Sequence, residues 1–306
     1  GWSSAGDTSA YNMITWVELH VAYGSTMEKD EWSVLPLTPA KIHGVGTLLK
    51  AGGYRSPKNY IRAAKVQHIG SGFRWTEELV LASTRFTAST MRGMGPSRQS
   101  EPINFRAAIN INYGDEPVIA NGPIGTKAVI VISTFWLLRE LEASTAKRSN
   151  LRLNDLAKTV TMRLPASKRD PYAIGVERTW GCTCRSSRPL PECPFHTAKY
   201  HKELLMRIFG GEVEDDDVPL FPRTDGSMLE PEDMIRLVEF IAVATGEKLV
   251  LAVGVRRFGK HSWRSTGAVF LSGLGIDIHK LMLLARWAST MIMHYARVAP
   301  LKSITD

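Results

Sequence analysis

The sequence predicts a mainly α-helical chain with one small β-sheet, an α+β fold that divides into two domains. Helix start and stop signals recur through the first hundred residues. One later stretch, residues 159–165, alternates apolar and polar side chains as a half-buried strand does. A chain of 306 residues also has room for two domains with sizeable cores. We therefore expect a helical domain over 1–105, with a linker at about 95–105, and a larger domain over 106–306.

The first domain is expected to contain about four helices. Apolar residues between 11 and 21 follow the spacing of one helix. Thr38-Pro39 and Ser56-Pro57 each place a capping residue before a proline, the pair that is typical of a helix N-terminus. Thr76 precedes two glutamates, whose charge suits the positive end of a helix dipole. Glycines follow each of these three segments and predict where the helices end.

The positive charge of the chain is concentrated in this helical domain. The whole sequence has a net charge of +8, and residues 38–100 hold ten basic residues against two acidic ones. A basic helical module suits the phosphate backbone of double-stranded DNA, because each neutralised phosphate releases counterions. The alternative is a helical bundle with scattered, solvated lysines. The residues that we expect to contact DNA are Lys50, Arg55, Lys58, Arg62 and Lys65, the last four as one helical stripe.

After the polar linker the chain is expected to stay loop-like as far as Pro123, and then to form one buried helix from Lys127 to Ala143. Arg139 emerges near the end of this apolar segment, where an unpaired charge would be costly. Glu142, one turn further on, is the obvious partner, so a simple ion pair at a helix end is one interpretation. The strand over 159–165 is followed by a turn that contains Lys168, and by a second strand around 176–180.

Three cysteines and a histidine form a C-x-C-x8-C-x-x-H cluster within residues 180–201. Their side chains could complete a tetrahedral structural zinc site, in a segment with no apolar pattern of its own. His201 is a substitute fourth ligand, and three buried or free thiols are the alternative. So few cysteines argue against a disulfide framework. The expected ligands are Cys182, Cys184, Cys193 and His196.

Near the C-terminus, His261 and Arg264 lie three residues apart, so that on a helix both could reach a single anion. Alone, this pair is equally consistent with a solvated helix face. It is followed by a helix of small residues, a Gly-Ile-Asp turn, an apolar helix that ends at Arg286-Trp287, and Tyr295.

This order of motifs resembles the C-terminal boxes of the tyrosine recombinase (phage integrase) family, in a variant like that of eukaryotic mobile elements. The family carries His-x-x-Arg, then His or Trp, then a nucleophilic Tyr. Arg139, within R-E-L-E, resembles the first catalytic arginine, and Lys168 falls where the family has its catalytic lysine. The resemblance implies a core-binding domain followed by a catalytic domain with six catalytic residues: Arg139, Lys168, His261, Arg264, Trp287 and Tyr295.

The resemblance implies site-specific cleavage and rejoining of DNA through a covalent 3′-phosphotyrosyl intermediate, for recombination or integration. The catalysis would need no cofactor, and the protein would act as a homo-tetramer on paired DNA sites. One alternative is a catalytically silent DNA-binding relative. Another is relaxation of DNA in the manner of a type IB topoisomerase, which uses the same chemistry.

Other signals bear on the location and the cofactors. No run approaches the roughly 20 apolar residues of a membrane span, and the N-terminus has no signal-peptide pattern. We therefore expect an intracellular, DNA-associated protein, nuclear if its host is eukaryotic. The sequence has no Walker or dinucleotide-binding glycine pattern, so neither ATP nor NAD is expected.

Overall fold

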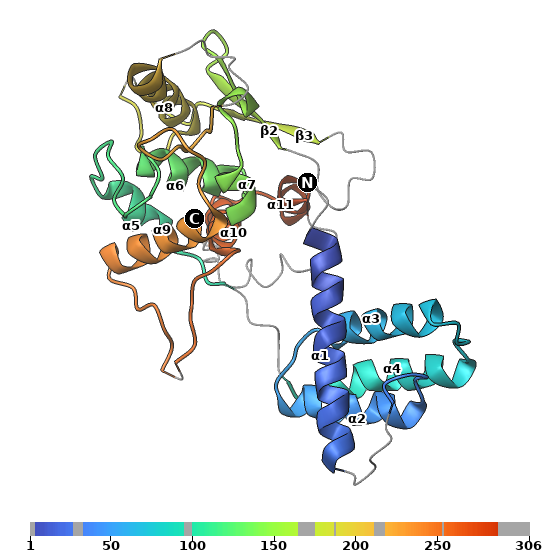
Figure 1. Ribbon diagram of the computed structural model, residues 1–306. Coiled ribbons are helices and arrows are strands. Elements are labelled where there is room, and N and C mark those ends of the chain that lie inside the picture. Colours follow the sequence, from blue (N-terminus) through green and yellow to red (C-terminus); the bar gives the residue numbers. More distant parts are fainter. Residues whose placement is uncertain are drawn as a thin grey trace. The chain divides into compact units, whose positions relative to one another are not determined.

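The computed structural model describes residues 4–26, 33–94, 100–164, 175–186, 188–210, 218–252 and 254–286. The chain forms two compact units, Gly1–Arg98 and Gln99–Asp306 (Figure 1). This division lies several residues before the expected boundary at 105. Ile103 and Phe105 are buried in the core of the second unit, and the N–H of Ile103 donates to Thr266 Oγ1 at 3.0 Å. The end of the expected linker therefore belongs to the second unit.

The first unit is helical in all of its described regular structure. Thr38 Oγ1 accepts a hydrogen bond from the N–H of Lys41, and Thr76 Oγ1 accepts one from the N–H of Leu79, as the capping patterns predict. Trp16, Phe86 and other apolar side chains from all four helices form a buried core. The helices are α1 (Ser4–Thr26), α2 (Pro39–Ala51), α3 (Pro57–Gly70) and α4 (Glu77–Met91).

The prediction of one buried helix from Lys127 to Ala143 is wrong. The structure has α6 (Thr126–Phe135) and the short α7 (Glu140–Ser144), separated by a sharp turn. Leu137 takes a left-handed backbone conformation with φ 49°, and the N–H of Leu138 returns to the carbonyl of Ser133 at 3.0 Å. This is the geometry that normally ends a helix at a glycine. Because a leucine occupies the position here, the sequence carries no stop signal.

The second unit contains helices that the sequence did not predict. The stretch expected to be loop-like includes α5 (Phe105–Asn110), which is capped by Asn104 and packs its first residue against Phe270 at 4.2 Å between ring centroids. A long helix, α8 (Pro194–Phe209), begins directly after the third cysteine. The other described helices of this unit are α9 (Pro231–Ala244), α10 (Ser262–Gly273) and α11 (Ile278–Ala285), with a 3-10 turn at Arg148–Asn150.

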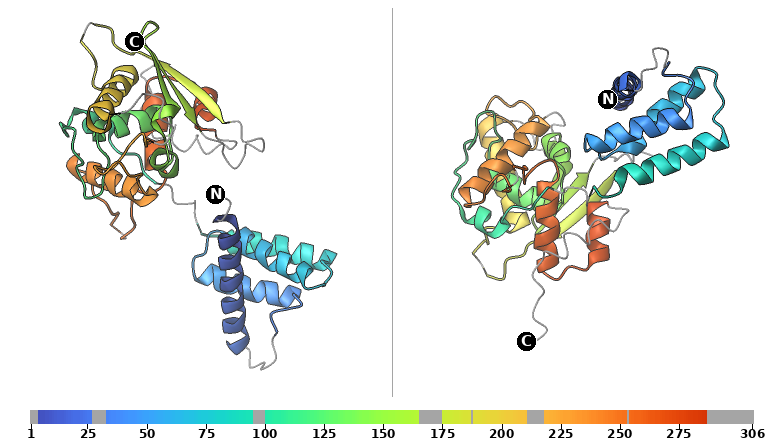
Figure 2. Two further views of the ribbon diagram at one scale, coloured as in Figure 1. Left: turned by 45° about the horizontal axis from the view of Figure 1, so that its top comes forward. Right: turned by 90° about the horizontal axis from the view of Figure 1, so that it is seen from below.

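The sheet has three antiparallel strands in the order β1-β2-β3: β1 (Leu151–Asn154), β2 (Thr159–Leu164) and β3 (Val176–Gly181). The predicted alternation is confirmed, since Val160, Met162 and Leu164 are buried. The four-residue β1 is too short to give such a pattern. Figure 2 shows the strands running along one side of the helices of the second unit. The mainly α fold with a small sheet is thus the predicted class.

Two tryptophans join the sheet to the end of α6. Trp136 Nε1 donates to the carbonyl of Arg178 at 3.0 Å, and Trp180 Nε1 donates to the carbonyl of Phe135 at 3.1 Å. The core of the second unit gathers around the fully buried residues 129–132 of α6. Strand β3 is thereby held against the segment that leads into Arg139.

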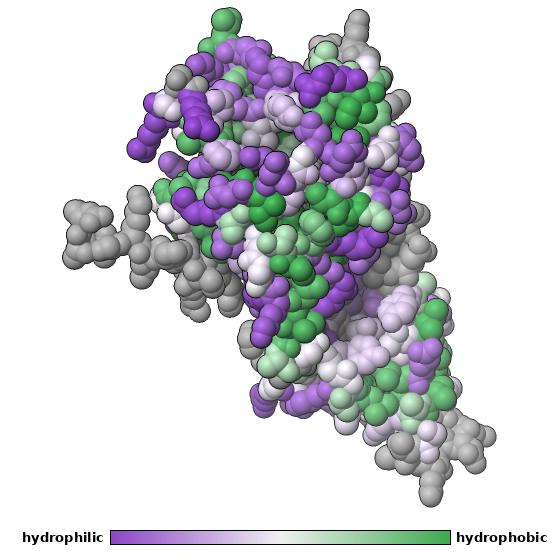
Figure 3. All heavy atoms as spheres, turned by 90° about the vertical axis from the view of Figure 1, so that its left-hand side faces the viewer, coloured by the Kyte–Doolittle hydropathy of each residue, from purple (hydrophilic) through white to green (hydrophobic). Residues whose placement is uncertain are grey.

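The surface of the second unit is mixed in character. On the face seen in Figure 3, hydrophilic side chains predominate, and hydrophobic ones form smaller groups between them. Among the helices that the structure describes, we find none with the length and hydrophobicity that crossing a bilayer requires.

Candidate active site

Arg264 is held in a buried position at the first turn of α10. Its side chain is 2% exposed, its Nε donates to the carbonyl of Leu137 at 2.7 Å, and its Nη2 donates to Glu142 Oε2 at 2.7 Å. Burial lowers the pKa of Arg264 to about 10, an effect that Glu142 opposes and that the charges of Arg139 and Arg286 reinforce. The guanidinium therefore keeps its positive charge at neutral pH, with two firm hydrogen bonds fixing its plane.

The placement of Arg264 depends on close contact between two helices. A Cβ atom added to Gly267 would lie 2.2 Å from the carbonyl oxygen of Thr134, so only glycine allows α10 to approach α6 this closely. The left-handed turn at Leu137 then presents its carbonyl oxygen to Arg264. Backbone strain of this kind costs about 1–3 kcal/mol and tends to occur at functional sites.

Glu142 is the carboxylate around which the basic groups of the site gather. Within the described part of the chain, it forms ion pairs with Arg139, whose Nη1 is 3.8 Å from Oε1, with Arg264, and with Arg286. It also accepts a hydrogen bond from the N–H of Arg139, the residue directly before α7. The Glu142 side chain is only 10% exposed, whereas that of Arg139 is 33% exposed. One carboxylate among three guanidinium groups leaves excess positive charge at an accessible edge, as an anion-binding site requires.

Arg286 is the member of this group that sequence reasoning missed. It ends α11 in a left-handed conformation, with φ 54°, and its Nη2 contacts Glu142 Oε1. On β3, Arg178 donates from Nη2 to the carbonyl of Leu283 at 3.1 Å, and burial together with the charge of Arg286 lowers the pKa of Arg178. The sequence placed Arg286 beside Trp287 at a helix end. Its long-range partner, 144 positions away, had no signal in the sequence.

His261 lies at the N-terminus of α10, one position before the helix, and not within a helical turn as expected. The residue is exposed to solvent. Partial loss of water around the ring lowers the pKa of His261, and the positive charges of Arg264 and Arg139 lower it further. A neutral imidazole at neutral pH can accept or donate a proton. The structure therefore brings together three of the six expected catalytic residues: Arg139, His261 and Arg264.

The other three expected catalytic residues lie outside the described residues. Lys168 falls between β2 and β3, while Trp287 and Tyr295 follow α11. Their roles therefore stay predictions.

The predicted basic stripe is only partly helical. Lys58, Arg62 and Lys65 lie on α3, but Arg55 precedes the helix and donates from Nη2 to the carbonyl of Met94 at 2.7 Å. Lys65 Nζ lies 4.9 Å from the centre of the Trp75 ring, a cation–π contact within the same unit. Lys50, Lys58 and Arg62 are exposed. The expectation of one four-residue helical stripe is thus wrong.

Cys182, Cys184, Cys193 and His196 come together, with their ligand atoms all within 4.8 Å of one another, so this cluster could hold a metal ion. His201 does not belong to it. It is fully buried, its Nε2 lies 2.7 Å from the carbonyl oxygen of Leu220, and burial lowers its pKa to about 4. The substitute ligand considered from the sequence is therefore a neutral core residue.

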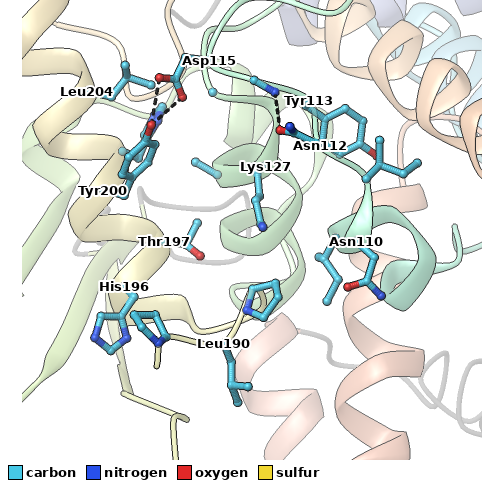
Figure 4. A pocket seen from close by; sticks show the side chains of 18 residues that line it. Asn110, Asn112, Tyr113, Asp115, Lys127, Leu190, His196, Thr197, Tyr200 and Leu204 are labelled. Atoms are coloured by element: carbon cyan, nitrogen blue, oxygen red, sulfur yellow. Dashed lines mark hydrogen bonds between the residues drawn. The ribbon is translucent and has the colours of Figure 1, made fainter. Parts of the chain in front are cut away.

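A pocket of about 580 Å³ lies between the start of α6 and the first turns of α8 (Figure 4). Tyr200 donates from its hydroxyl to Asp115, at 3.0 and 2.9 Å from the two carboxylate oxygens, and Lys127 extends into the hollow. His196 lies at one end. Of the expected catalytic residues that the structure describes, none lines this pocket.

Neither protein-family models nor curated proteins match the sequence. Solved structures do match the fold. The XerH site-specific recombinase, in a post-cleavage complex with a palindromic difH substrate, matches with a TM-score of 0.58 and 13% identity, over 97% of this chain and 76% of that chain. A lambda integrase tetramer bound to a Holliday junction gives a TM-score of 0.55 and 14% identity, over 95% and 79% of the two chains.

The integrase of the Tn1549 transposon, in complex with circular intermediate DNA, gives a TM-score of 0.54 and 10% identity. The match covers 94% of this chain and 96% of that chain. The similarity thus extends over both units, at identities where the fold alone is informative. The chain therefore has the tyrosine recombinase fold.

Proposed function

We propose that this chain cleaves and rejoins double-stranded DNA at specific sites, in recombination or integration of the mobile-element type. The observation that carries the proposal is the gathering of Arg139, Arg264 and Arg286 around the single carboxylate of Glu142, beside His261. A phosphodiester repels nucleophiles, so its cleavage needs cations that are already aimed at its non-bridging oxygens. Arg139, one-third exposed, is the member that a DNA phosphate could reach first.

In the proposed reaction, the hydroxyl oxygen of Tyr295 attacks phosphorus, while His261 accepts the phenol proton. The bond from phosphorus to the 5′-oxygen breaks, and Lys168 protonates the leaving oxygen. The products are a 3′-phosphotyrosyl link and a free 5′-hydroxyl group. Attack by a 5′-hydroxyl group of another strand reverses these steps and releases the tyrosine. Trp287 would pack at the site. Because the covalent link conserves the phosphodiester bond energy, rejoining needs no ATP.

The first unit would hold the DNA backbone through the exposed Lys50, Lys58 and Arg62, with Arg55 and Lys65 beside them. Paired DNA sites would be joined by four copies of the chain. Support for this assembly comes from a fold shared with a lambda integrase tetramer on a Holliday junction. The protein would accordingly be associated with DNA in the cell.

The test is covalent capture of DNA by the purified full chain. Wild-type protein and Tyr295→Phe are each incubated with a random-sequence pool of nicked duplexes, and complexes that survive detergent are recovered. Mass spectrometry after nuclease digestion then locates the nucleotide adduct. We expect an adduct on Tyr295 in the wild type and none in the variant, while both still bind DNA in native gels.

The capture assay separates the catalytic from the silent alternative, and a second assay on supercoiled plasmid separates recombinase from topoisomerase. DNA binding without any adduct in the wild type would indicate a catalytically silent relative. An adduct that persists in Tyr295→Phe would move the nucleophile to another residue. Relaxation of supercoiled plasmid without four-way junctions would indicate a topoisomerase, since recombination must pass through exchange between two duplexes.

A further inference from the structure

We infer that Cys182, Cys184, Cys193 and His196 bind one Zn²⁺ ion, which fastens the end of β3 to the beginning of α8. The first two cysteines follow β3, which ends at Gly181. Cys193 is the residue before the first turn of α8, and His196 lies within that turn. The ligands thus come from two elements that are separated in the chain by an irregular segment.

Four of the six distances between the ligand atoms are close to those of a tetrahedral site. With Zn–S bonds of about 2.3 Å and a Zn–N bond of about 2.0 Å, neighbouring ligands should be separated by roughly 3.5–3.8 Å. Cys182 Sγ lies 3.7 Å from Cys193 Sγ. His196 Nδ1 lies 3.6, 3.4 and 3.2 Å from the sulfur atoms of Cys182, Cys184 and Cys193. All four ligand atoms lie within 4.8 Å of one another, so small shifts of the side chains would enclose the ion.

Backbone amides around the cluster support thiolate ligands. The N–H of Cys184 points to Cys182 Sγ at 3.4 Å, and the N–H of Leu190 points to Cys184 Sγ at 3.2 Å. Hydrogen bonds of this kind stabilise the negative charge of metal-bound sulfur and orient it. They are independent of the convergence of the four ligands and favour the same interpretation.

The ligand set selects the metal and its role. Three thiolates and one imidazole suit Zn²⁺, whereas Mg²⁺ and Ca²⁺ prefer oxygen ligands. Four protein ligands also close the coordination sphere, as in structural zinc sites, because a catalytic site keeps a position for water. A disulfide between Cys182 and Cys193 is the competing arrangement. A disulfide would not explain why Cys184 and His196 also lie within 4.8 Å of these two cysteines.

The position of the site indicates what the ion would stabilise. Strand β3 contributes Trp180 to the end of α6 and Arg178 to the end of α11, both through hydrogen bonds to backbone carbonyls. Cys193 and Phe195, at the start of α8, are buried in the core of the second unit. The ion would therefore hold β3 and α8 in register beside the segment that carries Arg139. Its removal should destabilise the second unit and leave the first unit folded.

The experiment measures metal content and metal geometry in the full chain, independently of any reaction with DNA. Protein purified without chelators is expected to hold about one Zn²⁺ per chain by elemental mass spectrometry. Replacement by Co²⁺ is expected to give the strong visible absorption of a tetrahedral ion and a thiolate-to-cobalt charge-transfer band. Cys184→Ser should lose most of the bound metal, whereas His196→Cys, which keeps four ligands, should retain it.

Ser186→Ala, in the same segment but outside the cluster, is the matched control and should bind metal like the wild type. If Cys184→Ser fails to fold, the wild type alone decides the matter, because mercurial titration of its thiols should release zinc in proportion to the thiols modified. Wild-type protein with less than about a tenth of an equivalent of metal and three freely reactive thiols would overturn the inference. A Cys182–Cys193 disulfide in the purified protein would overturn it as well.

Discussion

Replacing Glu142 with glutamine should strongly destabilise the second unit, because it removes the carboxylate that compensates a buried guanidinium. The Arg264 side chain is 2% exposed and is paired with Glu142 at 2.7 Å. Breaking a buried ion pair by removing one partner costs about 3–5 kcal/mol. The hydrogen bond from Arg264 Nε to the carbonyl of Leu137 survives the substitution, so we expect the lower end of this range, about 3 kcal/mol.

The assay is hydrogen exchange in the full chain, which reports on each unit separately. A loss of about 3 kcal/mol should raise the exchange rates of globally protected amides in α6 and α10 by roughly a hundredfold, with no change in α2 and α4. Glu239→Gln is the matched control. Its partner Arg256 is 61% exposed, and pairs of this kind contribute about 0–1 kcal/mol. If Glu142→Gln costs no more than Glu239→Gln, the carboxylate does not compensate a buried charge and our account of the site is incorrect.

Three further predictions concern the site, the DNA and pH. Arg139→Ala should lower the rate of adduct formation by about a hundredfold. It should cost little stability, since the Arg139 side chain is one-third exposed. A near-normal rate would show that Arg139 only forms an ion pair with Glu142 and does not act on DNA. Replacing both Lys58 and Arg62 with alanine should weaken DNA binding. The slope of log K against log salt should fall by about 0.9 for each lost phosphate contact. An unchanged slope would mean that these side chains are solvated and do not contact DNA. Burial lowers the pKa of His201 to about 4, so the folded state binds fewer protons than the unfolded state below the ordinary histidine pKa near 6.5. The free energy of unfolding should therefore fall as pH drops from 7 towards 4, by up to about 1 kcal/mol per unit, and His201→Gln should flatten this dependence measured by urea unfolding.

The features that the sequence predicted correctly depend on neighbours in the chain. Thr38 and Thr76 cap helices because a side-chain oxygen reaches an amide three residues ahead, whatever the rest of the molecule does. The alternation over 159–165 predicted the strand observed at Thr159–Leu164, because successive side chains of a strand point to opposite faces. The spacing of His261 and Arg264 and the R-E-L-E segment likewise pointed to three residues that lie near one another in the structure, while their catalytic roles stay predictions.

Tertiary structure decided the features that depend on partners far along the chain. The chain divides before residue 99 because Ile103 is hydrogen-bonded to Thr266 in the second unit. Helix α6 ends at a strained turn at Leu137, whose carbonyl accepts a hydrogen bond from Arg264. Arg286 reaches Glu142 only because α11 ends in a left-handed turn beside the site. No local pattern encodes such contacts, since a leucine or an arginine with positive φ is unfavourable by itself and is maintained by surrounding packing and charge. The residue types of the site could thus be predicted from the chain, but their common carboxylate and their excess of positive charge are properties of the folded second unit.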